Sequence, residues 1–309
     1  MIFFSQALQR LSTVATIFLG IFIEALPYLL LGIVASGFIE VFVNKDLILR
    51  FIPKNRILAI LIGSVLGLLF PVCEHSVIPL TRRLYNKGLP VSMGITFILS
   101  APVMNPIAIA VTLAAFGMGP VFWGRIILVP VIAIITGLIF SFQKDEEILA
   151  SLPENLVFDC PHCGHAVDSQ SSIKEKILQS IELVGDEFFE IGLYFIIGAL
   201  LAALLQTLVP QSVLLAIGGG PVLSILIMIL LAVILNICSR VDAFVALSFV
   251  GSFSTGSILA FLVYGPMIDI KSIMMLTRVF KKKTILYLAL IPLFLVILAS
   301  LFITFNLAL

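Results

Sequence analysis

A thiol, a carboxylate and an imidazole stand side by side at Cys73, Glu74 and His75, within the stretch from Phe70 to Arg83. Thiolate and imidazole ligands suit soft or borderline metals and metalloids. A thiol beside a base can also act as a nucleophile. The structural alternative is that Cys73 fills apolar space and that His75 is hydrogen-bonded within a turn. Because the surrounding sequence is apolar, this stretch is the first candidate for a site that handles a polar substrate.

A second group of polar residues, Cys238, Arg240 and Asp242, also lies in an apolar region. Unpaired charge is costly there, so Arg240 is expected either to pair with Asp242 or to hold an anion. Two proline-containing breaks, Pro102–Pro106 and Gly265–Ile270, interrupt other apolar runs. The candidate substrate-contacting residues are Cys73, Glu74, His75, Asn105, Cys238, Arg240, Asp242 and Asp269.

Several polar residues have structural alternatives to a role in binding. Asn105 could cap the helix that follows it, and Asp269 could pair with Lys271. The Lys271 ammonium could instead extend to the membrane surface. Glu24 and Glu190 are predicted to lie in the first turn of their spans, where a carboxylate is favourable; a proton relay is the alternative.

The composition identifies the elements that must position these residues. The chain has 309 residues, of which 61% are apolar and 11% charged, whereas soluble domains carry about 25% charge. Apolar runs of about 18 residues or more recur, and each could cross the hydrocarbon core as a helix. We therefore predict an all-α polytopic protein of the plasma or inner membrane. The expected partners are the bilayer and a small-molecule or ion substrate. The net charge of +1 argues against nucleic acid as a partner.

The chain contains an internal duplication. Glu24 and Cys73 are 49 positions apart, and Glu190 and Cys238 are 48 apart. With this offset Asn105 corresponds to Asp269. We predict a first membrane repeat at 1–142, a cytoplasmic linker at 143–187 and a second membrane repeat at 188–309.

The distribution of basic residues predicts that the two repeats are inverted, because Lys and Arg favour cytoplasmic connections. Basic connections occur at Asn44–Arg56, Arg82–Lys87 and Arg278–Lys283, and uncharged ones at Phe116–Phe122, Thr207–Val222 and Ala246–Ser257. The basic residues then lie mostly inside, with Arg10 and Arg125 outside. Each repeat would cross three times and hold one re-entrant broken-helix hairpin, with tips at Pro71–Ser76 and Asn236–Asp242. The tips and breaks are predicted to converge, as in transporters built from inverted repeats.

The linker contains the sequence Cys160-Pro161-His162-Cys163-Gly164-His165. A Cys-x-x-Cys turn of this kind is typical of zinc ribbons, so Cys160, Cys163, His162 and His165 are candidate zinc ligands. The sequence has no second Cys pair to close a four-cysteine site. The site is therefore open, completed by a second copy of the chain in a homo-oligomer, or vestigial. A redox dithiol is the alternative.

The sequence resembles the ArsP/YraQ-type predicted permeases. The matching segments are Phe70–Leu84, Lys87–Pro90, Phe97–Pro106 and Cys238–Ala246. The family pattern for the first is roughly F-P-V-C-x-C-G-x-x-P-x-x-R-R-L, and here His75 and Ser76 replace its second Cys-Gly. The resemblance implies an efflux or export permease, with trivalent organoarsenicals as the substrates of one branch. His75 in place of cysteine favours borderline ions such as zinc or copper, or a sulfur-containing molecule.

The predicted function is that of a secondary efflux permease, not an enzyme. Its substrate would be a soft metal, a metalloid or a thiol-reactive small molecule that crosses through a central site between the repeats. The sequence has no Gly-x-x-x-x-Gly-Lys phosphate loop, so an ion gradient or a partner must supply the energy. One alternative is a channel-like transporter of a sulfur-containing anion. Another is a membrane-embedded thiol enzyme that uses Cys73 and His75.

Overall fold

The computed structural model describes residues 2–42, 53, 55–68, 74–143, 145–150, 173–208 and 220–306. The regular elements are α1 (Ile2–Phe42), α3 (Arg56–Val65), the 3₁₀ turn η1 (Leu66–Leu68), α4 (Val77–Asn86), α5 (Val91–Ser100), α6 (Pro106–Phe116), α7 (Pro120–Phe140), α8 (Asp145–Ile148), α9 (Ile173–Leu208), α11 (Pro221–Leu235), α12 (Asp242–Leu247), α13 (Thr255–Met267), α14 (Ile270–Leu276) and α15 (Lys282–Asn306). Within these ranges the only β-type pairings are isolated bridges. The all-α fold class is therefore confirmed for the described residues.

Four stretches of the described chain are long and apolar enough to cross a membrane: Leu11–Leu31, Pro120–Phe140, Thr255–Leu276 and Lys282–Asn306. The third contains α13, a break and α14. Helices α3 and α5 have 10 residues each and therefore extend only about 15 Å at 1.5 Å per residue. Neither could cross a ~30 Å core alone. The chain is thus a multi-pass membrane protein that also contains short helices. Its inverted arrangement remains a prediction.

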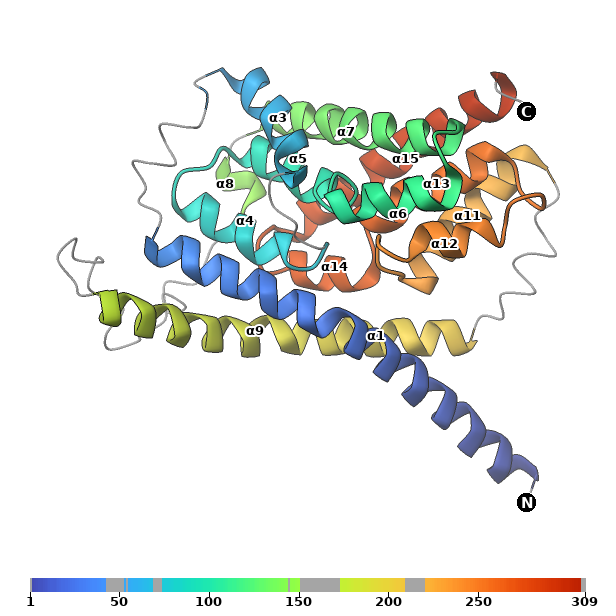
Figure 1. Cartoon of the computed structure of the whole chain (residues 1–309), viewed down its shortest axis with the longest axis horizontal. Coiled ribbons are helices and arrows are strands. Elements are labelled where there is room, and N and C mark those ends of the chain that lie inside the picture. Colours follow the sequence, from blue (N-terminus) through green and yellow to red (C-terminus); the bar gives the residue numbers. More distant parts are fainter. Residues whose placement is uncertain are drawn as a thin grey trace.

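Two long helices, α1 and α9, lie side by side along one side of the molecule, and the beginning of α1 extends beyond the rest (Figure 1). The short helices α4, α12 and α14 lie between this pair and the group that contains α7 and α15 (Figure 1). Helix α4 packs on α1, α14 packs on α9, and α4 also contacts α14. The short helices, whose ends carry most of the candidate residues, are therefore enclosed by long helices.

Glu24 and Glu190 do not lie in first turns, so that prediction was wrong. Helix α1 begins at Ile2 and α9 begins at Ile173, which places both glutamates in helix interiors. The residues that precede each glutamate remain helical, and the free N–H groups are therefore at the distant starts of the helices. The side chains of these glutamates lie outside the described part of the structure.

The proline-containing breaks both end in a capped helix. Asn105 Oδ1 accepts a hydrogen bond from the Ile107 N–H at 2.9 Å, and Pro106 occupies the first position of α6, where its missing N–H costs nothing. The capping role expected as one alternative for Asn105 is therefore confirmed. The second break is narrower than predicted, because Pro266 still belongs to α13 and only Ile268 and Asp269 leave the helix.

Helix α11 ends at a residue in the left-handed conformation. Asn236 has φ 53° and ψ 45° and is the one non-glycine residue with positive φ in the described chain. The chain then runs without regular structure to the start of α12 at Asp242. Asn236 and Ser239 are nevertheless buried. Irregular backbone at membrane depth needs such burial within protein or a wet cavity.

Candidate functional site

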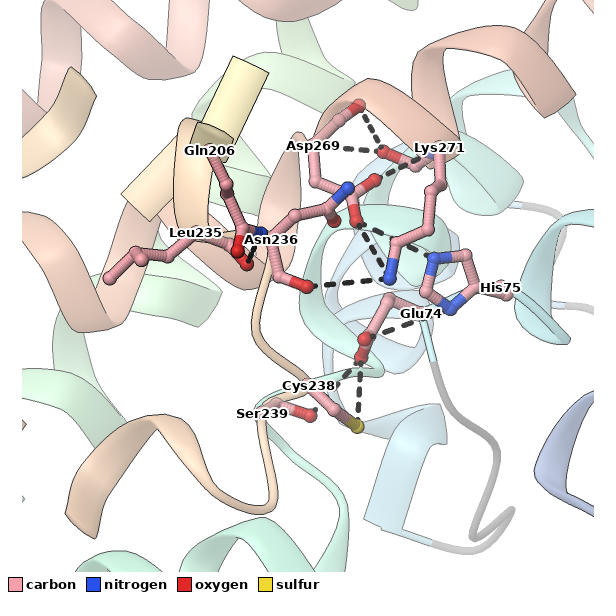
Figure 2. Close-up of polar contacts among 10 residues, drawn as sticks. Glu74, His75, Gln206, Leu235, Asn236, Cys238, Ser239, Asp269 and Lys271 are labelled. Carbon is pink, nitrogen blue, oxygen red and sulfur yellow. Dashed lines mark hydrogen bonds and ion pairs between the residues drawn. The ribbon is translucent and has the colours of Figure 1, made fainter. Parts of the chain in front are cut away.

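Polar side chains from three separate parts of the chain meet in the interior. We call this set the central cluster; its members are Glu74, His75, Asn236, Cys238, Ser239, Asp269 and Lys271. Figure 2 shows them converging from the segment before α4, from the segment after α11 and from the start of α14. All are buried except Cys238, which is partly buried.

The imidazole of His75 lies between two carboxylates. Its Nδ1 is 3.7 Å from Glu74 Oε1, and its Nε2 is 3.5 Å from Asp269 Oδ2. Glu74 and His75 immediately precede α4, whereas Asp269 caps α14 and accepts from the Ser272 N–H at 2.5 Å. Two helix starts therefore bring these ionisable groups together. A buried charge of this kind persists when it is paired and hydrogen-bonded.

Lys271 completes the charged part of the central cluster. Its Nζ is 3.8 Å from Asp269 Oδ2 and donates to the Asn236 carbonyl at 3.4 Å. Lys271 is only 2% exposed, so it does not reach the membrane surface, and the alternative pairing with Asp269 is the one observed. Phe195 of α9 lies beside it, with the ammonium 5.7 Å from the ring centroid.

Close helix packing holds Lys271 in place. A Cβ added to Gly198 of α9 would lie 2.8 Å from Lys271 Cα, a distance that side-chain carbons do not adopt without a shift of the backbone. The absence of a side chain at Gly198 therefore lets α14 approach α9 closely. This approach places the Lys271 ammonium in the interior.

The two predicted hairpin tips touch through Glu74. Its Oε2 accepts from Ser239 Oγ at 3.3 Å and lies 3.9 Å from Cys238 Sγ. Glu74 and Cys238 are 164 positions apart. The thiol of one tip and the carboxylate of the other thus face the same space.

A second buried group joins α6, α7 and α12. Arg125 of α7 is 0% exposed. It donates to Asp242 Oδ1 at 3.0 Å, to Asp242 Oδ2 at 2.5 Å and to Thr112 Oγ1 at 2.9 Å. The carboxylate of Asp242 holds the guanidinium of Arg125 inside the bundle, and the expected location of this end of α7 on the external side remains a prediction. The alternative in which Asp242 pairs with Arg240 was wrong.

The structure brings Glu74, His75, Cys238 and Asp269 together, as the sequence predicted. Asn105 is buried at its cap, Asp242 belongs to the group of Arg125, and Arg240 is half-buried in the segment before α12. Cys73 lies outside the described residues, as do all four linker candidates: Cys160, His162, Cys163 and His165. Among the residues described, no group of three or more His, Cys, Asp or Glu could hold a metal ion. Metal binding, whether by the central candidates or by the four linker candidates, therefore remains a prediction.

Sequence reasoning missed Asn236 and Ser239 as members of the cluster and Arg125 as a site residue. Arg125 carried a usable signal, since a charge within an apolar span usually faces the bundle interior and has a partner. Lys271 had the same signal. Ser239 and Asn236 had none, because small polar residues are ordinary in irregular segments.

The chain is similar to a family of predicted permeases over nearly its whole length. The profile of the predicted permease family ArsP_1 matches residues 10–305. The UPF0718 protein YcgR of Bacillus subtilis is 44% identical over 275 residues, which cover 88% of this chain and 90% of that protein. A putative two-component membrane permease complex subunit of Streptococcus mutans is 39% identical over 283 residues, which cover 91% of this chain and 90% of that protein. No solved structure matches the chain.

Proposed function

Because the chain belongs to the ArsP_1 family of predicted permeases, we propose that this membrane permease is a secondary efflux transporter whose substrate passes the central cluster. The proposed substrate is a soft metal, a metalloid or a thiol-reactive small molecule. The permease resides in the plasma or inner membrane, with the linker in the cytoplasm.

The contact between the two tips carries this proposal. Glu74 lies against Cys238 and Ser239 at 3.9 and 3.3 Å, in irregular segments at the ends of short helices. Transporters place substrate sites at such broken helices near the membrane midplane. Cys238 supplies a thiol at this point, and Cys73, which precedes Glu74, would supply a second.

The order of the elements supports an inverted-repeat mechanism. In this proposal α1, α3, α4, α5, α6 and α7 correspond to α9, α11, α12, α13, α14 and α15. Asn105 and Asp269, which correspond by sequence offset, each cap the helix that follows a break. Rocking of one repeat against the other would expose the central cluster to each side in turn.

The experiment that tests this function compares cellular accumulation of zinc, copper and a trivalent organoarsenical in cells with and without the gene. The deletion strain should accumulate more of at least one, and Cys73→Ala and Cys238→Ala should behave like the deletion. Ser248→Ala, at an exposed position after α12, is the matched control and should behave like wild type. Unchanged accumulation of every compound in the panel would refute efflux of this class.

A channel-like transporter of a sulfur-containing anion is the second candidate. The buried Lys271 ammonium favours it: this cation donates to the carbonyl of Asn236, which belongs to the same irregular segment as the Ser239 hydroxyl, and a cation and a hydroxyl can hold an anion. Under this candidate, the deletion should lower uptake of thiosulfate and leave the metal content of the cells unchanged. Increased metal content in the deletion strain would decide against it.

We also propose that Cys160 and Cys163 bind zinc together with His162 or His165. Purified protein should then contain zinc, and Cys160→Ser with Cys163→Ser should remove it. Equal zinc content in the two proteins would exclude the site.

A partner subunit is part of the proposal as well. The Streptococcus mutans relative is named as a putative subunit of a two-component complex. Affinity purification of this chain from its native membrane tests whether it also has a partner subunit. A stoichiometric second protein would support an assembly of this kind. Recovery of this chain alone would contradict it.

A further inference from the structure

The side-chain amide of Asn236 is buried without a hydrogen-bond partner. Both Nδ2 and Oδ1 are inaccessible and unpaired, and the residue is 3% exposed. The great majority of buried polar side-chain atoms have a partner, so a specific exception requires an explanation. Leaving such a group unpaired costs free energy. A ligand that supplies the missing partners would explain why the amide is present.

The backbone conformation of Asn236 does not explain the amide. Its φ of 53° is tolerated by asparagine but is adopted more easily by glycine. The backbone carbonyl, not the side chain, accepts the hydrogen bond from Lys271 at 3.4 Å. Glycine would satisfy both requirements. The side chain therefore needs a separate reason.

The groups around Asn236 define what kind of ligand would fit. Figure 2 shows it beside the Asp269–Lys271 pair, in the same cluster as Glu74 and Cys238. Lys271 and the amide N–H offer donors, whereas the two carboxylates and the amide oxygen offer acceptors. A fully ionised anion would face two carboxylates without protons to donate. A bare cation would leave the amide N–H and the ammonium unmatched. A ligand with both hydroxyl groups and free oxygens matches the whole set.

We propose that the Asn236 amide recognises the transported substrate and that this substrate is a small hydroxylated oxyacid, neutral or singly charged. The amide N–H donates to an oxygen of the ligand, and Oδ1 accepts from one of its hydroxyls. Cys238 lies two positions along the same segment and presents its thiol to the central atom. This inference rests on the proposed function, because it assigns the ligand of the same central cluster.

Everted membrane vesicles that contain the full chain provide the test. The probes are hydrogen selenite, which keeps a hydroxyl at neutral pH, and thiosulfate, which has none. Wild-type vesicles should accumulate more selenite than vesicles without the protein, and they should not accumulate thiosulfate. Asn236→Gly should be at least as heat-stable as wild type, with a KM for selenite raised about tenfold, the effect of one lost hydrogen-bond pair. Asn86→Gly, at an exposed asparagine that ends α4, is the matched control and should leave KM unchanged.

Asn236→Asp separates recognition from folding, because aspartate is isosteric and also tolerates positive φ. It keeps one acceptor and removes the donor, so KM should rise at least as much as for glycine. A stable Asn236→Gly or Asn236→Asp with wild-type KM would overturn the role of the amide. Transport of thiosulfate but not selenite would overturn the ligand class. Both failures leave the permease function intact, whereas failure of the wild-type chain to move any compound, including the metal panel above, would refute the proposed function itself.

Discussion

Arg125 and Asp242 form a bidentate ion pair in the interior, with Nη1–Oδ1 at 3.0 Å and Nη2–Oδ2 at 2.5 Å. The residues are 117 positions apart, on α7 and α12, and both are almost fully buried. Two parallel N–H···O bonds fix orientation as well as distance. The pair therefore fastens the two parts of the chain that we propose as repeats.

Removing one partner of this pair should destabilise the protein strongly. Asp242→Leu leaves the Arg125 guanidinium buried without a carboxylate, which costs about 3–5 kcal/mol. The double variant Arg125→Met with Asp242→Leu should recover most of that loss, because no buried charge remains. Thermal unfolding of the detergent-purified protein, followed by helical circular dichroism, measures both.

The control for this pair is Arg56→Ala. Arg56 is exposed and donates to the Ser141 carbonyl, so its loss should have little effect on the unfolding temperature. A double variant as unstable as Asp242→Leu would contradict the interpretation of Arg125–Asp242 as a balanced pair.

Lys271 should be required for transport as well as for stability. Lys271→Met removes the ammonium from Asp269 and the donor from the Asn236 carbonyl. The single variant should be destabilised by about 3 kcal/mol or more, whereas Lys271→Met with Asp269→Asn should regain stability but remain inactive. Transport of the compound that responds to gene deletion measures activity. A stable double variant with full activity would show that the two charges are only structural.

The central cluster was predicted from the sequence to a large extent because charged residues in apolar runs are easy to recognise. Glu74, His75 and Asp269 stood out as ionisable residues in apolar sequence, and Cys238 stood out through its correspondence with Cys73. The expectation that irregular segments at membrane depth are buried within protein correctly brought their segments together. Pairing between charges could not be predicted in the same way. Asp242 has Arg240 two positions away, yet it pairs with a guanidinium from another helix, and only the packing of α7 against the rest decides this.

Helix starts were predicted poorly, again for a physical reason. Glu24 lies within an apolar stretch, and Glu190 stands where apolar sequence resumes. Neither residue begins its helix, because a helix can start well before its apolar part. Polar residues such as those at the start of α9 continue the helix outside the apolar region. The unpaired amide of Asn236 could not be predicted from sequence, since burial and the absence of partners are properties of the packed structure.

The close approach of α9 and α14 gives a prediction with a matched control. Gly198→Ala places a methyl group 2.8 Å from Lys271 Cα, so α14 must shift and the Lys271 ammonium must move with it. We expect about 1–3 kcal/mol of destabilisation from overpacking and a marked loss of transport. Gly192→Ala on the same helix meets nothing within 4 Å and should retain both stability and transport. Equal behaviour of the two variants would contradict the role of this contact.

The proposed inversion of the two repeats predicts the side of the membrane on which each connection lies. Basic connections favour the cytoplasm, and the uncharged connection between α6 and α7 should therefore be external, whereas the linker should be internal. Single cysteines at Gly117 and Ser169, introduced after the native cysteines are replaced, should react with a membrane-impermeant maleimide from opposite sides. Gly218, in the connection of the second repeat that corresponds to the basic Asn44–Arg56, should be labelled from outside. Labelling of Gly218 from the cytoplasm, or labelling of Gly117 only after the membrane is opened, would rule out the inverted arrangement and the rocking mechanism that depends on it.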